Sequence, residues 1–160
     1  MTDIVSWLQE LTQALPPFLR WVGVLVAGAV PYVEAEGGAA LGVVAGLDVR
    51  ISIPVAIVGN ALALAAVVWL AGAARAGVTR GRTKSATPKM QRVRRVFDRY
   101  GVPGVSLLGP LLLPSHVTAA AMVGFGAPRT RVFVWGVAAV AAWAVVFGVL
   151  VHLGVSAAVA

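Results

Sequence analysis

Two acidic residues interrupt a long apolar region of the chain. The segment "PYVEAEGGAALG", residues 31–42, carries Glu34 and Glu36 among alanine, glycine, valine and leucine. Carboxylates in such surroundings are expensive to ionise, and they usually bind protons, ions or substrate. On a helix the two would point about 200° apart, whereas an extended segment would direct both to one side. Pro31 and the Gly37-Gly38 pair favour the extended segment, and therefore a proton-binding pair of carboxylates; the alternative is a solvated external loop.

A second polar cluster lies in the other half of the chain. Ser115, His116 and Thr118 follow Pro114 at the start of a helix predicted over residues Ser115–Phe125. Histidine exchanges protons near neutral pH, and a helix N-terminus with two hydroxyl groups suits an anion. The sequence therefore predicts proton relay or anion binding at this position. An ordinary helix cap near the membrane interface is the alternative.

The remaining polar candidates flank these clusters. Asn60 lies in the uncharged stretch 51–74, where it is expected to hydrogen-bond the backbone of a broken helix rather than substrate. Four charged residues lie near the ends of the broken stretches: Asp48, Arg50, Arg129 and Arg131. We expect the arginines to anchor the chain at the membrane interface, to attract a phosphate headgroup, or to pair with Asp48 and the glutamates.

Few residues suit enzymatic chemistry. The chain has no cysteine, and its acidic residues and two histidines form no pattern typical of a metal site. No catalytic residue, metal or cofactor is predicted, and the chain is not expected to be an enzyme.

The composition is that of a membrane protein. Hydrophobic residues make up 59% of the 160 positions, charged residues only 12%, and the mean hydropathy is +0.90. Three stretches without Asp, Glu, Lys or Arg, residues 51–74, 100–128 and 132–160, each equal or exceed the roughly 20 residues that cross a bilayer as a helix. The predicted fold class is all-α integral membrane, in a single membrane domain.

Positive charge is concentrated in residues 75–99. This segment holds nine of the thirteen basic residues and one acid, Asp98. Short loops rich in Lys and Arg stay in the cytoplasm, so we expect it on the cytoplasmic side of a bacterial inner membrane. No stacking aromatics or recognition motif accompany the charge, so nucleic acid is not an expected partner. Thr87-Pro88 is the predicted start of an amphipathic helix that lies on the membrane surface. Its arginines are expected to contact anionic headgroups; they are Arg92, Arg94, Arg95 and Arg99.

The two halves of the chain have the same order of features. Each of the predicted repeats, 1–74 and 88–160, begins with an amphipathic helix, the first with Asp3 as a possible cap and an apolar face of Ile4, Trp7, Leu8, Leu11 and Leu15. Each continues with a broken apolar stretch, a short charged turn and one long apolar helix. This order indicates two repeats joined by a basic linker, residues 75–87.

The broken stretches decide the topology. Residues 21–33 and 37–47 are too short for two comfortable spans, which favours a re-entrant hairpin that enters and leaves on one face. With a hairpin in each half, eleven basic residues lie inside and two outside; with single spans the distribution is ten and three. The counting favours hairpins and hence inverted repeats, as in secondary transporters, and short spans remain the alternative.

Several segments resemble a known family. "PYVEAEGGAALGV", Gly59-Asn60 and "RVFDRYGVPGVSLLGPLLLPSH" are similar to the putative small multidrug export proteins, distant relatives of the DedA proteins. The resemblance implies an inner-membrane transporter with two opposed re-entrant hairpins, and the DedA relation implies undecaprenyl phosphate as a type of substrate. DedA proteins typically carry an arginine in the second hairpin. Residues 100–128 contain neither arginine nor lysine.

The expected function is a proton-coupled transporter or flippase for an amphipathic substrate such as an anionic, lipid-linked polyprenyl phosphate. An exporter of small cationic drugs and a non-transporting, membrane-organising protein are the alternatives. The expected partners are membrane lipids, protons and the substrate. Two spans and two hairpins are little protein to enclose a path, so a homo-oligomer is also expected, with helices packed through small-residue faces such as "GNALALAA".

Overall fold

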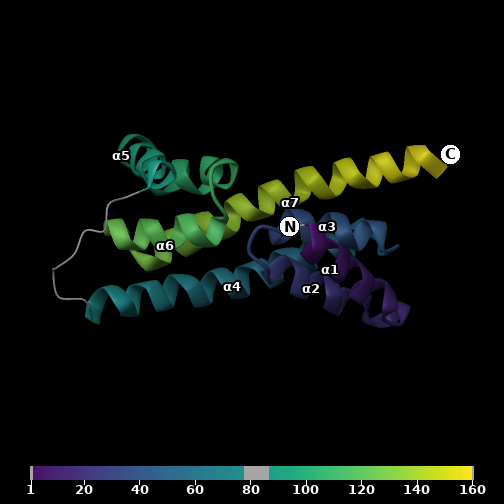
Figure 1. Cartoon of the computed structure of the whole chain (residues 1–160). Coiled ribbons are helices and arrows are strands. Elements are labelled where there is room, and N and C mark those ends of the chain that lie inside the picture. The colour runs from purple at the N-terminus through teal and green to yellow at the C-terminus, as the bar shows by residue number, and fades with distance from the viewer. Residues whose placement is uncertain (1, 78–86, 160) are drawn as a thin grey trace. The chain divides into compact units, whose positions relative to one another are not determined.

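The computed structural model describes residues 2–77 and 87–159, and these are α-helical without any strand (Figure 1). The predicted all-α class is confirmed. Most of the predicted linker 75–87 lies outside the described residues, although α4 continues to Gly77. The helices are α1 (Thr2–Ala14), α2 (Arg20–Ala29), α3 (Glu34–Val44), α4 (Val49–Gly77), α5 (Pro88–Leu108), α6 (Ser115–Phe125) and α7 (Arg129–Val159), with 3₁₀ turns η1 (Pro17–Leu19) and η2 (Gly109–Leu111).

The helices fall into two length classes. The short helices α2, α3 and α6 have 10, 11 and 11 residues, or about 15–17 Å, half the roughly 30 Å thickness of a bilayer core. α4 and α7 have 29 and 31 residues and are long and apolar enough to cross a membrane. In their most apolar windows only 33% and 28% of the residues are buried, so most of the apolar surface of α4 and α7 faces outward.

The described chain forms two compact units. The first contains α1, α2, α3, the part of α4 that ends at Leu62 and the part of α7 that begins at Val140. Within it α2 packs against α3 and α1 packs against α2 (Figure 1). Its core consists mostly of small apolar side chains, among them Val24, Ala35, Ala39, Ala56, Val140 and Ala144.

Glycines bring α2, α3 and α4 together in the first unit. A Cβ at Gly28 would meet the carbonyl group of Ala56, and one at Gly38 would meet the backbone nitrogen of Gly28. The sequence-based expectation that Gly37-Gly38 breaks the helix is therefore wrong. Both glycines lie inside α3, where the absence of a side chain at Gly38 permits the close approach of the two backbones.

The N-terminal helix buries only part of its predicted apolar face within the first unit. Leu8 and Thr12 are fully buried, whereas Ile4 and Trp7 are more than half exposed. The Thr12 hydroxyl donates to the Leu8 carbonyl at 2.7 Å, which satisfies this polar group without water and lets it pack against Gly23. Asp3 lies in the first turn of α1 and not at its cap, because the helix already includes Thr2.

The second unit contains residues 63–139, with α5 packed against η2 and α6. The Thr87 hydroxyl accepts from the Met90 amide at 3.3 Å, which confirms the predicted start of α5. Gly101, with φ 64°, interrupts α5 and separates its amphipathic part from the apolar part that precedes the η2 turn. The amphipathic part buries Val93 and exposes Lys89, as the sequence predicts. The core of this unit includes Leu64, Val68, Val105, Met122 and Val132.

The buried positions of the two long helices share one register. On α4 they recur every fourth residue at Ser52, Ala56, Asn60, Leu64 and Val68. On α7 the buried positions include Val132, Gly136, Val140, Ala144 and Gly148, each 80 residues after its counterpart on α4. Because a step of four keeps side chains on one helix face, α4 and α7 each present one continuous stripe to the cores.

Candidate functional site

The turn between α2 and α3 contains two non-glycine residues in a left-handed backbone conformation, Tyr32 with φ 75° and Glu34 with φ 55°. Each such residue costs roughly 1–2 kcal/mol, and strain of this kind gathers at functional sites. The turn is closed by the Glu34 amide, which donates to the Val30 carbonyl at 3.0 Å. Glu34 itself is only 3% exposed. A strained turn therefore holds a carboxylate inside the first unit.

The structure corrects the predicted pairing of the two glutamates. Glu34 and Glu36 both belong to the first turn of α3, so they are not on an extended segment and do not point to one side. Glu34 is buried and Glu36 is half-buried. The geometry thus separates the two residues, and of the two only Glu34 is buried.

The packing of α3 on α4 places a second polar residue near the level of Glu34. Gly42 lies against Ser52, and one turn further Gly38 lies against Ala56. The two helices therefore run in opposite directions with a step of four residues. Continued by one turn, this register sets Glu34 at the level of Asn60.

Asn60 is an unusual residue in this core. Its side chain is fully buried, and neither its amide nitrogen nor its amide oxygen has a hydrogen-bond partner among the described residues. The predicted hydrogen bond from Asn60 to the hairpin backbone is therefore wrong. Ser52, two turns earlier on the same stripe, also has a buried hydroxyl without such a partner. Buried polar groups are nearly always satisfied in native proteins, so an orphaned amide here needs a functional or solvent-based explanation.

Arg20, which was not among the predicted site residues, contacts the C-terminal end of α3. Arg20, at the start of α2, donates through Nη1 to the Ala45 carbonyl at 2.8 Å. The contact lies beside Gly46, whose φ of 84° ends the helix. A guanidinium at a helix C-terminus satisfies a free carbonyl and opposes the helix dipole.

The second unit contains the same kind of contact between an arginine and a helix C-terminus. Arg75 donates through Nη1 to the Val123 carbonyl at 2.9 Å, near the end of α6, and packs over Gly126, whose φ is 111°. The available sequence signal was the glycine that follows or ends each 11-residue helix, Gly46 and Gly126. Spacing alone could not pair residues 25 and 48 positions apart.

The polar cluster of the second unit is buried. α6 spans Ser115–Phe125 as predicted, and Ser115, His116 and Thr118 are 6%, 3% and 2% exposed. The Thr118 hydroxyl donates to the Ser115 carbonyl at 3.0 Å, so its proton is committed to the helix and not to an external anion. The helix N-cap is Pro114, without a side-chain cap. The alternative that this cluster caps the helix is therefore not supported by the structure.

The charged residues near the predicted hairpin ends separate by role. Asp48 accepts the Arg50 backbone amide through Oδ1 at 2.7 Å and so caps the start of α4. Both residues are exposed, and the predicted side-chain ion pair between them is absent from the described chain. Arg129 passes over Gly72 and lines a cavity of about 340 Å³ together with Arg75. Arg131 is exposed on α7.

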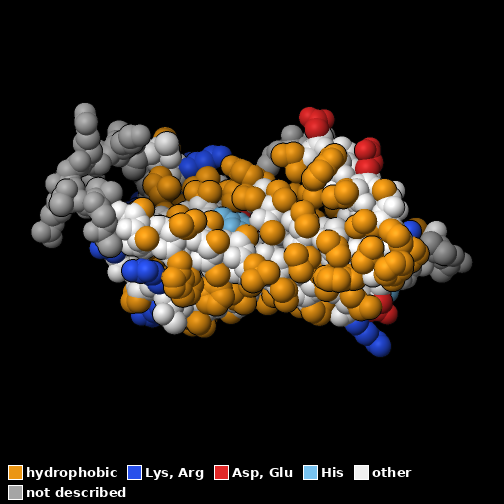
Figure 2. All heavy atoms as spheres, turned by 90° about the horizontal axis from the view of Figure 1, so that it is seen from below, with side chains coloured by type: hydrophobic (Ala, Val, Ile, Leu, Met, Phe, Trp, Pro, Cys, Tyr) orange, Lys and Arg blue, Asp and Glu red, His pale blue; other side chains and the backbone are white. Residues whose placement is uncertain are grey.

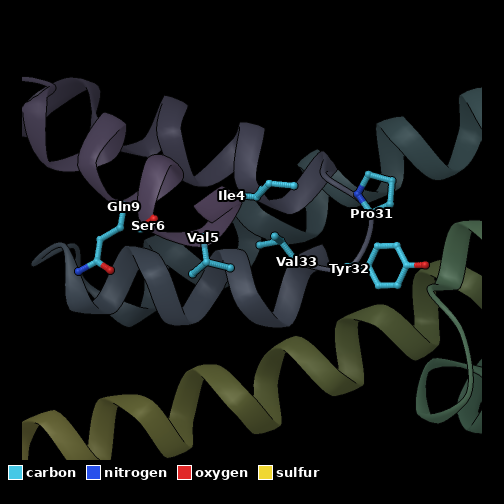
Figure 3. A pocket seen from close by; sticks show the side chains of 7 residues that line it. All are labelled: Ile4, Val5, Ser6, Gln9, Pro31, Tyr32 and Val33. Atoms are coloured by element: carbon cyan, nitrogen blue, oxygen red, sulfur yellow. The ribbon is translucent and has the colours of Figure 1, made fainter. Parts of the chain in front are cut away.

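A largely apolar cavity lies beside the strained turn. It has a volume of about 560 Å³ and lies between α1 and the turn that precedes Glu34 (Figure 3). Pockets of this size with few polar groups are typical of small amphipathic ligands. The lining residues are Ile4, Val5, Ser6, Gln9, Pro31, Tyr32 and Val33.

The candidate residues divide between the two units. The first holds Glu34, Glu36, Asp48, Arg50 and Asn60, and the second holds the α6 cluster together with the arginines of α5 and the start of α7. Among the described residues no group of His, Asp or Glu is arranged to hold a metal ion. In comparisons with known proteins, no protein family, curated protein or solved structure matches this chain.

Proposed function

We propose that this chain is an integral membrane transporter that moves an amphipathic substrate and couples its movement to protons through Glu34. The observation that carries the proposal is the burial of this carboxylate on a left-handed residue, at the turn of a helix pair too short to cross a bilayer. Ionisable groups in a membrane protein's interior usually serve ion or proton pathways.

The outward surface supports a membrane location. Large apolar side chains along α4 and α7 are about half exposed or more, among them Leu62, Leu70, Val134, Leu150 and Leu153. Hydrophobic side chains cover most of the face seen in Figure 2. A helix in the core of a soluble protein buries such residues, so lipid is the environment that explains them. In this proposal the basic segment 75–99 faces the cytoplasm of a bacterial inner membrane.

Features that recur in the two halves support two repeats. α3 and α6 both have 11 residues, both end at a left-handed glycine, and both carry an arginine on a carbonyl near that end. The buried stripes of α4 and α7 share their register at a distance of 80 residues. We propose that α2–α3 and the apolar part of α5 with α6 are re-entrant hairpins of inverted orientation, an architecture typical of secondary transporters and of the family that the sequence resembles.

Proton exchange at Glu34 would change the charge of a buried site. The neutral acid is compatible with the apolar core, while the carboxylate needs water, a cation or a hydrogen-bond donor. Asn60 can supply a donor, since its amide nitrogen has no other partner among the described residues. Loss of the proton therefore favours a rearrangement of the strained turn, which lies beside the 560 Å³ cavity. This sequence of events would link protonation to access for substrate.

The test is transbilayer movement of fluorescent phosphatidate in proteoliposomes, measured by dithionite quenching with and without a proton gradient. The wild-type chain should move the probe faster with the gradient, and Glu34→Gln should remove at least about 90% of that acceleration. Glu10→Gln, which changes an exposed glutamate on α1, is the matched control and should behave like wild type. Equal rates for Glu34→Gln and wild type would contradict the proposal and favour a membrane-organising role.

A buried carboxylate also favours a second candidate, the export of small cationic drugs, for which Glu34 would be the counter-charge. The same proteoliposomes loaded with ethidium separate the two. Proton-driven ethidium efflux that needs Glu34, without movement of phosphatidate, would select the cation exporter.

A further inference from the structure

Three arginines surround a cavity on the amphipathic part of α5. Arg92, Arg95 and Arg99 recur at helical spacing and line a space of about 360 Å³. Val96, Tyr100 and Leu112 complete its wall, with Leu112 contributed by the residue that follows η2. All of these residues belong to the second unit, and the three arginines and Tyr100 are exposed, so the cavity is an open hollow at the surface between the basic helix and the turn that leads to α6.

The fourth arginine of this helix is engaged elsewhere. Arg94 donates to both carboxylate oxygens of Asp98, at 2.9 and 3.1 Å. Its guanidinium carbon lies 4.9 Å from the centre of the Phe125 ring and 6.0 Å from that of Phe97. This arginine is neutralised by its acid and holds α5 against α6. Of the four arginines of α5, Arg94 therefore contributes to packing, and the other three line the cavity.

Among the described residues, the three cavity arginines form no salt bridge with an acid. Asp98 is the only acid of α5, and its carboxylate is occupied by Arg94. Arg99 lies over the ring of Tyr100, with its guanidinium carbon 5.3 Å from the ring centre, a cation–π contact that favours this orientation of the side chain. Three arginines that line one cavity without a carboxylate can together donate to the several oxygens of one phosphate group.

We infer that this cavity binds the phosphate headgroup of one anionic lipid. Arg92, Arg95 and Arg99 hold the phosphate, and Val96 and Leu112 contact the first apolar atoms of the lipid. The wall residues favour a lipid over free phosphate, because a soluble anion gains nothing from apolar contact. The inference deepens the proposed function by naming the substrate's headgroup, and it rests on that function for the presence of the membrane. It differs from general attraction of a basic helix to anionic lipid, because it predicts one saturable site with named ligands.

The experiment is native mass spectrometry of the full chain in neutral detergent, titrated with dioctanoyl phosphatidate. Wild type should retain one phosphatidate with a saturable Kd, and Arg95→Gln should weaken that Kd about tenfold, because it removes one of the three charged groups that hold the phosphate. The triple variant Arg92→Gln/Arg95→Gln/Arg99→Gln should lose the bound lipid. Lys89→Gln is the matched control, since it removes one exposed charge from the same helix outside the cavity.

Two results would overturn the inference. Equal weakening by Arg95→Gln and Lys89→Gln would mean that the lipid adsorbs to the charged surface without a site. Inorganic phosphate that displaces phosphatidate at equal concentration would mean that the cavity recognises a free anion. Thermal unfolding of each variant checks that it is folded. Glu34→Gln should bind phosphatidate like wild type, so failure of the transport proposal and failure of this site are distinguishable.

Discussion

At the scale of single residues, the candidate site contains residues in energetically unfavourable conformations or environments. Tyr32 and Glu34 adopt a backbone conformation that favours glycine or asparagine, and Asn60 has a buried amide without a partner among the described residues. Proteins keep such residues where they serve activity at the expense of stability. For Tyr32 and Asn60 we therefore expect that a suitable substitution does not lower the free energy of unfolding, contrary to the usual effect of a mutation.

Tyr32 is the clearest case of backbone strain, because its side chain is 65% exposed and contributes little burial. We expect Tyr32→Asn to leave the free energy of unfolding unchanged or to raise it, since asparagine tolerates positive φ. Tyr32→Val should lower it by about 1–2 kcal/mol, because a β-branched residue is poorly tolerated there. Chemical unfolding of the purified chain in detergent measures both. A valine variant as stable as the asparagine variant would show that the turn is not strained.

Asn60 tests whether an unsatisfied group is kept for function. Asn60→Leu replaces the orphaned amide with an apolar group of similar size. It should raise the free energy of unfolding by about 1–3 kcal/mol, while slowing proton-driven movement of phosphatidate. The two measurements are unfolding in detergent and the proteoliposome assay. Lower stability with normal transport would instead assign Asn60 a structural role, such as binding an internal water molecule.

At the scale of elements, glycines set how closely the short helices approach. Gly38→Ala should lower the free energy of unfolding by about 2 kcal/mol or more, because the new methyl group meets the backbone of α2. Gly124→Ala is the control. It lies in α6 with no neighbouring atom at its Cβ position, so alanine should stabilise it by up to about 1 kcal/mol through helix propensity. Similar effects at the two positions would contradict the packing described for α2, α3 and α4.

The arginine contacts at the ends of α3 and α6 give a local prediction. Arg20→Met keeps the apolar stem but removes the donor to the Ala45 carbonyl. Hydrogen exchange should accelerate about tenfold in residues 41–48, since a charged hydrogen bond contributes about 1.5–3 kcal/mol. Arg50→Met, which removes an exposed arginine, should not change exchange in that segment. Unchanged exchange in Arg20→Met would mean that the contact does not hold the helix end.

At the scale of the whole molecule, the sequence predicts elements better than it predicts their contacts. Apolar periodicity and turn residues indicated the all-α class, the start of α5 at Thr87-Pro88 and the bounds of α6. The first break includes Pro31 as expected, but the predicted break at Gly37-Gly38 was wrong, because both glycines lie inside α3 and Gly38 permits close packing against α2. A local pattern cannot distinguish these uses of glycine, since the deciding contact lies on another helix.

The candidate site was only partly predictable for the same reason. Glu34 and the α6 cluster are conspicuous in the sequence as polar residues in apolar stretches, and the structure buries both. The division of the α5 arginines into Arg94 and the three cavity residues depends on Phe125, far along the chain. The contacts of Arg20 and Arg75 with the carbonyl groups near the ends of α3 and α6 likewise depend on tertiary packing.

The central claim is that Glu34 lies in a helix pair that turns inside the membrane. Its most direct test is cysteine accessibility in intact cells, with single cysteines at residues 31–42 of this naturally cysteine-free chain. Asp48→Cys, in an exposed turn, is the labelled control, and Trp69→Cys, within a proposed span, is the protected control. We predict that positions 34–39 resist a membrane-impermeant thiol reagent, as Trp69→Cys does. Labelling of every position as rapid as that of Asp48→Cys would make the segment an external loop and would contradict the account.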